Sequence, residues 1–409
     1  MTTERSTLVV AWQVPFPPDR GGRIWSFHLI RALRELGRVT VVCVQHTPEE
    51  GRSIEALEEQ GFSVVPLPGP SVRFRWWDHL ASAQPVLAKQ YGLPALRRRL
   101  SALALAHNRY DLVMVDGLFI APCVREIGGV PLLYAAHNVE SEIYQRSLRL
   151  MDAPLKSLLA ARVDCWKLAR FERHAVRRFP FIAAVSARDR DWFQACAPAA
   201  SVFVVPNGAD CGRLRPVPTV AAEPGALVFV ANLSYLPSRD AVLYFGREIF
   251  PRIRNEMPSV KWYVVGEDPE SVRRAFRNDP GIIFTGYVDD VREYVARSQV
   301  VVVPLRAGGG TRLKILEAMA MGRPVVSTSL GAEGLELRDG TDILVADTPE
   351  AFASAVLRVL KVSGVENRLA TAGRRAVLER YDWGSITRGF QDAILRIWEN
   401  QPAGTALKV

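Results

Sequence analysis

The sequence predicts an α/β protein built from two doubly wound parallel-sheet domains. Short apolar runs alternate with amphipathic stretches of helical spacing through the first half of the chain, and the same alternation restarts after residue 225. Runs such as SQVVVVPL suit strands that are buried on both faces of a parallel sheet. A proline-rich polar segment, RPVPTVAAEPG, separates the two series and is typical of a linker. We therefore expect domains at 1–212 and 225–384, a linker at 213–224, and a final helix with a tail at 385–409.

Length and composition indicate an ordinary globular protein. The chain has 409 residues, of which 48% are hydrophobic and 23% charged. The N-terminus lacks a signal-peptide pattern, and no stretch reaches about 18 apolar residues, so we expect a cytoplasmic protein. The cysteines are odd in number and lack CxxC spacing, which argues against a disulfide framework or a zinc site; they are Cys43, Cys123, Cys165, Cys196 and Cys211.

The first domain opens with a strand, a helix and a strand. TLVVAWQV predicts a strand, the apolar spacing over 22–36 predicts a helix, and RVTVVCV predicts the next strand. Gly21 and Gly22 lie between the first strand and the helix, where doubly wound folds bind phosphate groups. A glycine pair also serves turn geometry alone, so the motif by itself is weak.

Later strands of this domain are predicted at YDLVMVDG, GVPLLYAA, FPFIAAV and SVFVV, with a long basic amphipathic helix over 155–179. His137 and Asn138 lie at the carboxyl end of the second of these strands, where ligands of open parallel sheets bind. A strand-end histidine is either structural or part of a site, and position alone does not separate the two interpretations.

A net charge of +9 admits nucleic acid, anionic lipid or a phosphorylated substrate as partners. The segment SVRFRWWDHL interleaves cations and rings, and it predicts either contact with a membrane surface or a buried aromatic cluster beside a solvated basic helix. The residues concerned are Arg73, Phe74, Arg75, Trp76 and Trp77. No RNA-binding or helix-turn-helix signature accompanies the charge, so we expect no nucleic-acid partner.

The second domain repeats the alternation. Strands are predicted at ALVFVANL, VKWYVVG, GIIFTG, SQVVVVPL and PVVSTS, and helices at 240–257, near 271, near 291, and at 349–360 and 365–380 before a last helix. Its unusual loops fall at strand carboxyl ends, at Asn232, Gly266 and the glycine triplet 308–310, where ligands of such sheets bind.

The glycine triplet is the strongest local signal. Three glycines let the backbone approach a ligand closely, and Thr311 is predicted to cap a helix that runs to about Met321. Backbone N–H groups at a helix N-terminus bind anions, phosphate above all. Lys314 is placed to reach such a phosphate and Glu317 to accept hydrogen bonds from ribose hydroxyls. The alternative is a surface Lys/Glu pair on an ordinary helix.

The segment AGGGTRLKILEAMAMG resembles the donor-binding region of the retaining GT-B glycosyltransferases of family 4. PFPPDRGGR and HNVE resemble the first glycine loop and the histidine loop of the same group, and the resemblance covers about residues 7–400. It implies two Rossmann-like domains facing across a cleft, with a C-terminal helix that crosses back to the first domain.

The resemblance implies a nucleotide-sugar donor, UDP- or GDP-linked, with no separate cofactor and no metal. The base would lie near Tyr287 and Val288, the ribose on Glu317, and the diphosphate on the 309–311 amides and Lys314. His137 would be the catalytic residue that orients the sugar. The full implied donor set is Gly21, Gly22, Asn232, Arg239, Gly266, Tyr287, Val288, Gly309, Gly310, Thr311, Lys314 and Glu317.

The chain departs from the family pattern in two places. Gly309 stands where the family has the first of two glutamates, and Asn232 and Pro237 stand where many members have an arginine and a lysine that clamp the diphosphate. Arg239 and Arg312 are candidates to replace that clamp.

The implied activity is a retaining, metal-independent hexosyl transfer to a lipid-linked or saccharide acceptor in surface or exopolysaccharide biosynthesis, by a protein peripheral to the inner face of the cell membrane. Two alternatives stay open: a non-catalytic sugar-nucleotide-binding partner of another transferase, and a nucleotide-sugar epimerase of the same fold. A dinucleotide dehydrogenase is disfavoured because the first loop lacks GxGxxG.

Overall fold

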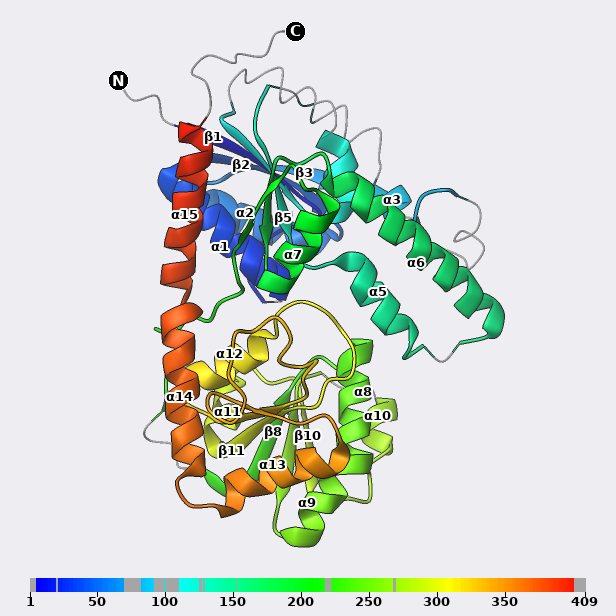
Figure 1. Cartoon of the computed structure of the whole chain (residues 1–409), viewed down its shortest axis with the longest axis vertical. Coiled ribbons are helices and arrows are strands. Elements are labelled where there is room, and N and C mark those ends of the chain that lie inside the picture. The colour runs from blue at the N-terminus through cyan, green and yellow to red at the C-terminus, as the bar shows by residue number, and fades with distance from the viewer. Residues whose placement is uncertain are drawn as a thin grey trace. The chain divides into compact units, whose positions relative to one another are not determined.

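The computed structural model describes residues 5–19, 21–69, 82–91, 100, 110–124, 127, 129–151, 153–217, 222–267 and 270–400. The chain forms two compact units (Figure 1). Unit 1 comprises Met1–Pro206 with Ile386–Val409, and unit 2 comprises Asn207–Ser385. Each is a parallel sheet covered by helices, which confirms the predicted fold class.

The sheet of unit 1 has the order β3-β2-β1-β4-β5-β6-β7, and its neighbouring strands run parallel. Because the chain moves outward from β1 to β3 and then restarts at β4, the order reverses between β1 and β4, which is where doubly wound sheets bind ligands. The strands are β1 (Arg5–Ala11), β2 (Gly37–Gln45), β3 (Ser63–Pro68), β4 (Leu112–Asp116), β5 (Leu132–Ala136), β6 (Phe181–Ala184) and β7 (Ser201–Val204).

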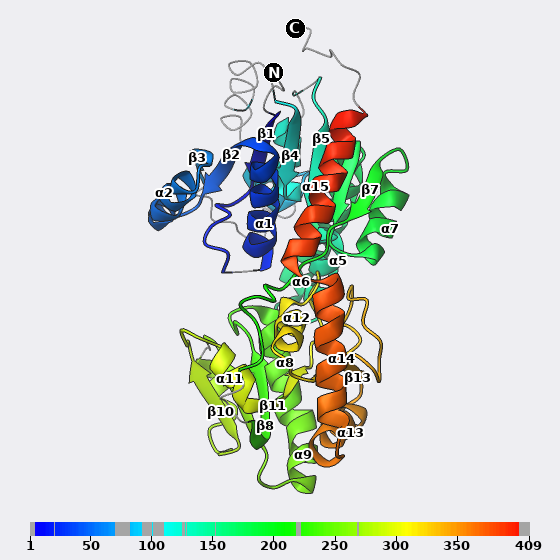
Figure 2. The same cartoon turned by 90° about the vertical axis from the view of Figure 1, so that its left-hand side faces the viewer.

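The helices of unit 1 connect these strands. They are α1 (Gly21–Leu36), the 3₁₀ turn η1 (Pro48–Glu50), α2 (Gly51–Glu59), α3 (Val86–Tyr91), η3 (Leu118–Val124), α5 (Glu140–Leu148), α6 (Leu155–Val176) and α7 (Ala187–Cys196). The last helix, α15 (Trp383–Glu399), begins in unit 2 and belongs to unit 1 from Ile386 onward. It lies beside α1 (Figure 2), and Gln391 donates to the Ala32 carbonyl at 3.0 Å.

Unit 2 repeats the design with the strand order β10-β9-β8-β11-β12-β13, so its reversal falls between β8 and β11. The strands are β8 (Glu223–Val230), β9 (Lys261–Val265), β10 (Ile282–Gly286), β11 (Ser298–Val303), β12 (Val325–Ser327) and β13 (Leu344–Val345). The helices are α8 (Leu236–Tyr244), the π-helical η4 (Phe245–Ile249), α9 (Phe250–Glu256), α10 (Glu270–Arg274), α11 (Arg292–Arg297), α12 (Leu313–Ala320), α13 (Pro349–Lys361) and α14 (Val365–Arg380).

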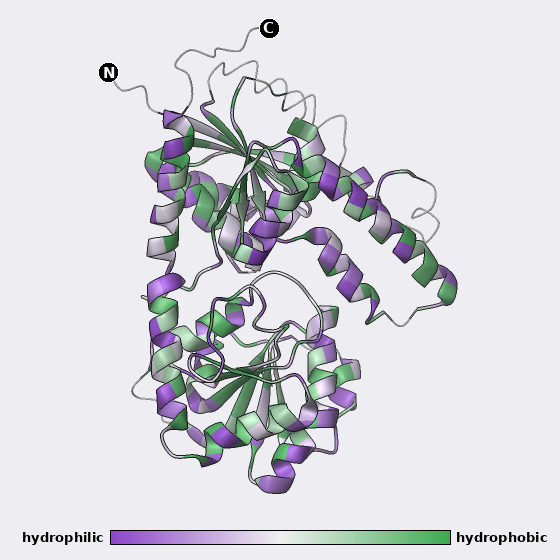
Figure 3. Ribbon diagram, viewed as in Figure 1, coloured by the Kyte–Doolittle hydropathy of each residue, from purple (hydrophilic) through white to green (hydrophobic). Residues whose placement is uncertain are grey.

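Both sheets are buried on their two faces, as their continuous apolar runs predict. Figure 3 shows the central strands coloured hydrophobic and the polar bands on the outer helices. In unit 2 the Trp262 ring lies 4.5 Å from Phe245 and 6.0 Å from Phe250, centroid to centroid. Such packing fixes the strands, and therefore fixes the loops at their carboxyl ends.

Three details differ from the predictions, and one prediction falls on residues that are not described. The helix expected from residue 240 begins at Leu236, with Pro237 in its first turn, where a missing N–H costs nothing. Strands β3 and β13 are short or partly exposed and were not predicted. Helix α12 begins at Leu313 with Arg312 as N-cap, so the assignment of Thr311 as the cap was wrong. The aromatic-basic segment 73–77 lies outside the described residues.

No helix of the described ranges is both long and apolar enough to cross a bilayer. All five cysteines are free thiols.

Helices α5 and α6 form a hairpin that projects from one side of unit 1 (Figure 1). The N-terminus of α5 has no side-chain cap from its own residues. Instead the buried Glu172 of α6 accepts hydrogen bonds from the amides of Glu140 (2.8 Å) and Ser141 (3.0 Å). One carboxylate thus accepts from two backbone N–H groups that have no partner within helix α5, and it fixes the segment that follows His137.

Replacing Glu172 by Ala is expected to lower the free energy of unfolding by about 1–3 kcal/mol, because amides in the first turn of α5 lose their acceptor in a buried place. Urea denaturation measures the change. Glu142→Ala, at a partly exposed position of the same helix hairpin, is the control and should cost less than ~1 kcal/mol. Equal stabilities of the two variants would contradict the assigned cap.

Candidate active site

The residues predicted for the site fall into two groups, one in each unit. Gly21, Gly22 and His137 lie at the carboxyl edge of the unit 1 sheet, beside the reversal between β1 and β4. The remaining ten residues of the predicted set belong to unit 2, where the glycine triplet follows β11 at the second reversal.

His137 is held by a buried carboxylate at the end of the neighbouring strand. Its Nε2 donates to Oδ1 of Asp116, whose side chain is 1% exposed. Ser26 of α1 donates to the other oxygen of Asp116 at 2.7 Å. The Trp25 ring packs edge-on against the imidazole at 5.0 Å between centroids. A Cβ added to Gly22 would lie 3.6 Å from His137 Nδ1, so the predicted glycine loop and histidine do meet.

These contacts orient the imidazole and change its pKa. Burial disfavours its charged form, but the charge and hydrogen bond of Asp116, with a further contribution from Glu140, outweigh burial and raise the pKa of His137. Because Asp116 occupies Nε2, Nδ1 is the ring nitrogen left for a ligand. Burial also raises the pKa of the nearby Glu140 carboxyl, against the opposing charge of His137.

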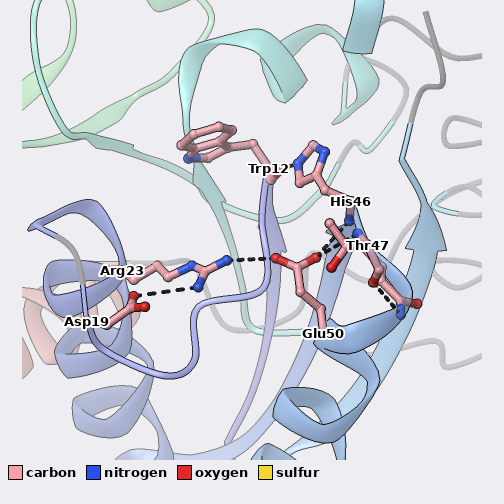
Figure 4. A network of polar contacts seen from close by, with 7 residues as sticks. Trp12, Asp19, Arg23, His46, Thr47 and Glu50 are labelled. Carbon is pink, nitrogen blue, oxygen red and sulfur yellow. Dashed lines mark hydrogen bonds and ion pairs between the residues drawn. The ribbon is translucent and has the colours of Figure 1, made fainter. Parts of the chain in front are cut away.

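A second network fixes the start of α1 (Figure 4). Arg23 donates to Glu50 at 2.7 Å and lies 3.5 Å from Asp19. Glu50 also accepts from the backbone amide of His46 at 2.7 Å, and the His46 ring bonds to the Trp12 carbonyl at 3.0 Å. These contacts tie the ends of β1 and β2 to the first turn of α1, and so position the glycine pair that precedes Arg23.

In unit 2 the glycine loop is held from one side by Arg312. Its guanidinium donates to the carbonyls of Gly309 and Gly310, the latter at 2.5 Å. Both peptide bonds after these carbonyls are trans, so the N–H groups of Gly310 and Thr311 point away from Arg312. Within the described ranges those two amides donate to no protein acceptor. The loop therefore displays hydrogen-bond donors at the start of α12, as an anion cradle requires.

The conformation of the loop needs glycine. Gly308 has φ +107° and Gly310 has φ +68°, a region that side chains disfavour. Thr311, although not the helix cap, has a defined role: its hydroxyl accepts a hydrogen bond from Asn207 Nδ2 at 2.7 Å. The Oδ1 atom of Asn207 is buried and has no hydrogen-bond partner among the described residues.

Lys314 and Glu317 follow on α12, and both are half-buried. Lys314 Nζ lies 4.4 Å from the centroid of the Phe229 ring. Burial, with the nearby charge of Arg312, lowers the pKa of Lys314 to about 7, while Glu317 opposes the shift. Burial likewise raises the pKa of Glu317, against the charges of Lys314 and Arg213. A bound anion would compensate the cost of charging Lys314.

The other predicted donor residues frame the same edge of unit 2. Asn232 is exposed and its Oδ1 accepts from the Ser234 amide at 2.8 Å, so it shapes the loop after β8. Arg239 is half-buried in the first turns of α8. Gly266 has φ +128°, and an added Cβ would lie 2.2 Å from the Ala231 carbonyl oxygen, so only glycine fits. Tyr287 is 77% exposed, while Val288 packs on the core.

Sequence reasoning missed Asp116, Ser26 and the contact of Asn207 with Thr311. Asp116 ends an apolar strand one place from β5 in the sheet, so its position at a carboxyl edge was a usable signal. The pairing of Ser26 with it depends on how α1 packs, which no local pattern specifies. Among the described residues no group of His, Cys, Asp and Glu could hold a metal ion.

Comparison with known proteins identifies the family. A model described as "Glycosyltransferase Family 4" matches residues 20–213, and one described as "Glycosyl transferases group 1" matches residues 224–362. The chain belongs to glycosyltransferase family 4. The two matched regions cover most of this family 4 chain and include all of the residues predicted for the site.

Two curated relatives are mannosyltransferases of Mycobacterium tuberculosis. Phosphatidyl-myo-inositol mannosyltransferase is 29% identical over 239 residues, which are 55% of this chain and 61% of that protein. GDP-mannose-dependent alpha-(1-6)-phosphatidylinositol monomannoside mannosyltransferase is 26% identical over 259 residues, or 56% of this chain and 66% of that protein. The matches thus span less than two thirds of their length.

Among solved structures, HepE of Anabaena in complex with UDP superposes with a TM-score of 0.68 over 96% of this chain and 100% of that one. Its sequence is 15% identical, so the likeness concerns the fold. It agrees with the two parallel-sheet units and confirms the predicted GT-B fold class.

Asp116→Asn is expected to lower the pKa of His137, because the variant keeps the shape of the side chain but removes the negative charge that favours the imidazolium. Histidine NMR titration measures the pKa, with His137→Gln to assign the resonance. Asp111→Asn, at the opposite end of β4, is the matched control and should leave that pKa unchanged. If the pKa of His137 were the same in Asp116→Asn as in the wild type, the assigned effect of Asp116 on that pKa would be wrong.

Proposed function

We propose that the protein is a retaining glycosyltransferase that moves a hexose from a nucleotide-sugar donor to a lipid-linked or saccharide acceptor. The observation that carries the proposal is the glycine loop of unit 2. Its Gly310 and Thr311 amides are turned outward at the start of α12, next to a lysine whose pKa is lowered by burial. Such a site suits a diphosphate, whose negative charge grows as the bond to the sugar breaks.

In this proposal unit 2 holds the nucleotide. The amides of Gly310 and Thr311, with the Lys314 ammonium, stabilise the departing diphosphate, and Glu317 accepts hydrogen bonds from the ribose. Arg312 acts through the backbone, because its guanidinium is engaged with the loop carbonyls. These positive groups supply the charge stabilisation that a metal supplies in other transferases, so the proposal assigns no metal.

His137 of unit 1 acts on the sugar. Asp116 orients the ring through Nε2 and raises its pKa, which favours the charged form, in which Nδ1–H is a donor. Asp116 itself is 1% exposed and is engaged by both His137 and Ser26, so it is poorly placed to attack a sugar as a nucleophile.

This supports a single displacement with retention. The bond from the anomeric carbon to the diphosphate oxygen breaks, the acceptor oxygen bonds to that carbon on the same face, and the acceptor proton passes to the departing phosphate oxygen.

The identities of donor and acceptor are further parts of the proposal. Relatives named for GDP-mannose and for phosphatidylinositol acceptors support a mannose-like hexose and a lipid-linked acceptor. HepE was crystallised with UDP, so a UDP-linked donor is the second candidate. Assembly of surface or exopolysaccharide, by a protein bound peripherally at the inner face of the membrane, is the process in which such a transfer would occur.

Donor recognition is tested by thermal unfolding with UDP, GDP, dTDP and ADP. One nucleotide is expected to stabilise the protein by roughly 2.7 kcal/mol at ~100-fold saturation. Glu317→Ala should lose most of this shift, while Glu379→Ala, on the exposed side of α14, should retain it. No shift with any nucleotide would contradict the proposed donor site.

Turnover separates the proposed enzyme from its alternatives. The nucleotide that binds is supplied as its hexose conjugate with a membrane extract as acceptor source, and released nucleotide and transferred sugar are counted. Equal amounts of both are expected, and His137→Ala should lower the rate by about 100-fold or more. Binding without turnover would indicate a non-catalytic partner, and conversion of the sugar without release of nucleotide would indicate an epimerase.

Because the pKa of Lys314 is lowered, we expect the protein to take up a proton when it binds a nucleoside diphosphate. In the protein without ligand, burial lowers the pKa of Lys314 to about 7, so above that pH the side chain is largely neutral. A bound diphosphate favours the charged form, so binding should add a proton to Lys314. The affinity should therefore fall as pH rises above 7, by up to about tenfold per pH unit.

Calorimetry at pH 8 in buffers of different ionisation enthalpy measures the proton uptake. Lys314→Met should abolish it, whereas Lys361→Met, which removes a surface lysine paired with Glu256, should not. Identical proton uptake by the wild type and Lys314→Met would contradict the assignment.

A further inference from the structure

The projecting hairpin of unit 1 carries an apolar face that the proposed chemistry does not use. On α6 the exposed fractions are 71% for Leu155, 51% for Leu159 and 64% for Trp166, and Val163 is exposed as well. Their spacing of three and four residues places them along one side of the helix, over about 16 Å. Large apolar side chains that are exposed together mark an interaction surface, whereas single ones do not.

The charges on the same helix are divided by sign. Its two acidic residues are buried: Asp164 accepts from the Val86 amide at 3.1 Å, and Glu172 caps α5. The exposed charged residues of α6 are all basic, and they are Lys156, Arg162, Arg170 and Arg173. We call the surface formed by Leu155, Leu159, Arg162, Val163, Trp166 and Arg170 the outward face of α6. It is apolar and positive, with no exposed carboxylate of its own helix.

A groove of about 800 Å³ continues this face between α5 and α6. Apolar side chains from both helices line it, including Leu148, Leu158 and Trp166, together with Arg149 and Arg162.

Among the described residues that line the groove, the one carboxylate is paired with arginines. Glu142 accepts from Arg188 at 2.5 Å and from Arg146 at 3.3 Å. The groove therefore combines apolar and basic side chains, as the outward face of α6 does.

We propose that the outward face of α6 docks on a bilayer surface that contains anionic lipid. An interfacial helix combines apolar side chains that enter the headgroup and acyl boundary with cations on its flank, as α6 does. Tryptophan suits this depth because its ring is apolar and its N–H is polar. Each arginine near an anionic surface contributes attraction that salt screens.

Other occupants match the surface less well. A nucleic acid would engage the arginines but leave Leu155 and Leu159 in water. A protein partner or a second copy would have to supply carboxylates without any basic residues to match, because α6 offers no exposed acid. Figure 3 shows hydrophobic bands alternating with polar ones along α6, as in an amphipathic helix.

This docking surface differs from the aromatic-basic segment 73–77, and it deepens the proposed function by assigning the peripheral membrane contact to a named surface. It rests on that function only for its purpose, since a lipid-linked acceptor would be met at the bilayer. Binding to vesicles needs no donor, so the two proposals can be tested separately. The protein could fail to bind vesicles and still transfer sugar, or it could bind vesicles and transfer none.

Vesicle flotation of the full chain without nucleotide tests the inference. Vesicles of phosphatidylcholine mixed with phosphatidylglycerol should bind the protein, and vesicles of phosphatidylcholine alone should bind it far less. Replacing both Arg162 and Arg170 by Gln should weaken partition to the mixed vesicles by about thirtyfold. Changing Leu155, Leu159 and Trp166 together to Ser should abolish flotation. Since these side chains are exposed, the variants should unfold at the wild-type temperature.

Matched controls come from unit 2. Val362→Ser with Leu378→Ser removes exposed apolar side chains there, and Arg358→Glu reverses an exposed charge, and all three should leave flotation unchanged. Three results would overturn the inference: no binding to mixed vesicles, binding that survives the triple Ser variant, or light scattering that shows a dimer which the triple variant dissociates without lipid.

Discussion

The bonds from Arg312 to the Gly309 and Gly310 carbonyls determine what unit 2 can do. A triple glycine is the most conformationally free sequence a loop can have, so ordering it is costly. The guanidinium satisfies consecutive carbonyls from one side, and the planar trans peptide group then aims the amides the other way. The buried Arg312 side chain thereby decides that N–H donors, and not carbonyls, are presented on the opposite side of the loop.

The two units use one topology for different chemistry. In both, strand order reverses beside the first strand of the sheet, and the loops proposed to form the site lie at that edge. Unit 1 has a buried carboxylate there that orients an imidazole and raises its pKa. Unit 2 has two amides that donate to no acceptor among the described residues, and a lysine whose pKa burial lowers to about 7. The scaffold supplies the position, and a few side chains at the strand ends supply the function.

Much of this could be read from the sequence, and the reasons for the exceptions are physical. Strands such as β11 and helices such as α14 follow from periodicity and length, which depend on the chain alone. The glycine triplet and the strand-end histidine were proposed for the site because ligands bind at the carboxyl ends of strands in a doubly wound sheet, and the structure places both at such ends. The N-cap of α12 was misplaced by one residue, because Thr311 instead accepts a hydrogen bond from Asn207, a residue 104 positions away. Asp116 and Ser26 were missed for the same kind of reason, since tertiary packing brings β4, β5 and α1 together.

Helix α15 begins in unit 2 and completes unit 1 with residues from the extreme end of the described chain. Its Phe390 and Ile394 are fully buried, and Gln391 bonds to α1. Unit 1 is therefore split into two segments, with the whole of unit 2 between them. During synthesis on the ribosome, the apolar surface of unit 1 that α15 covers must wait uncovered until unit 2 has been translated. A chain that terminates early at Ser385 would hold every residue assigned to the site, yet it would leave that surface open to aggregation.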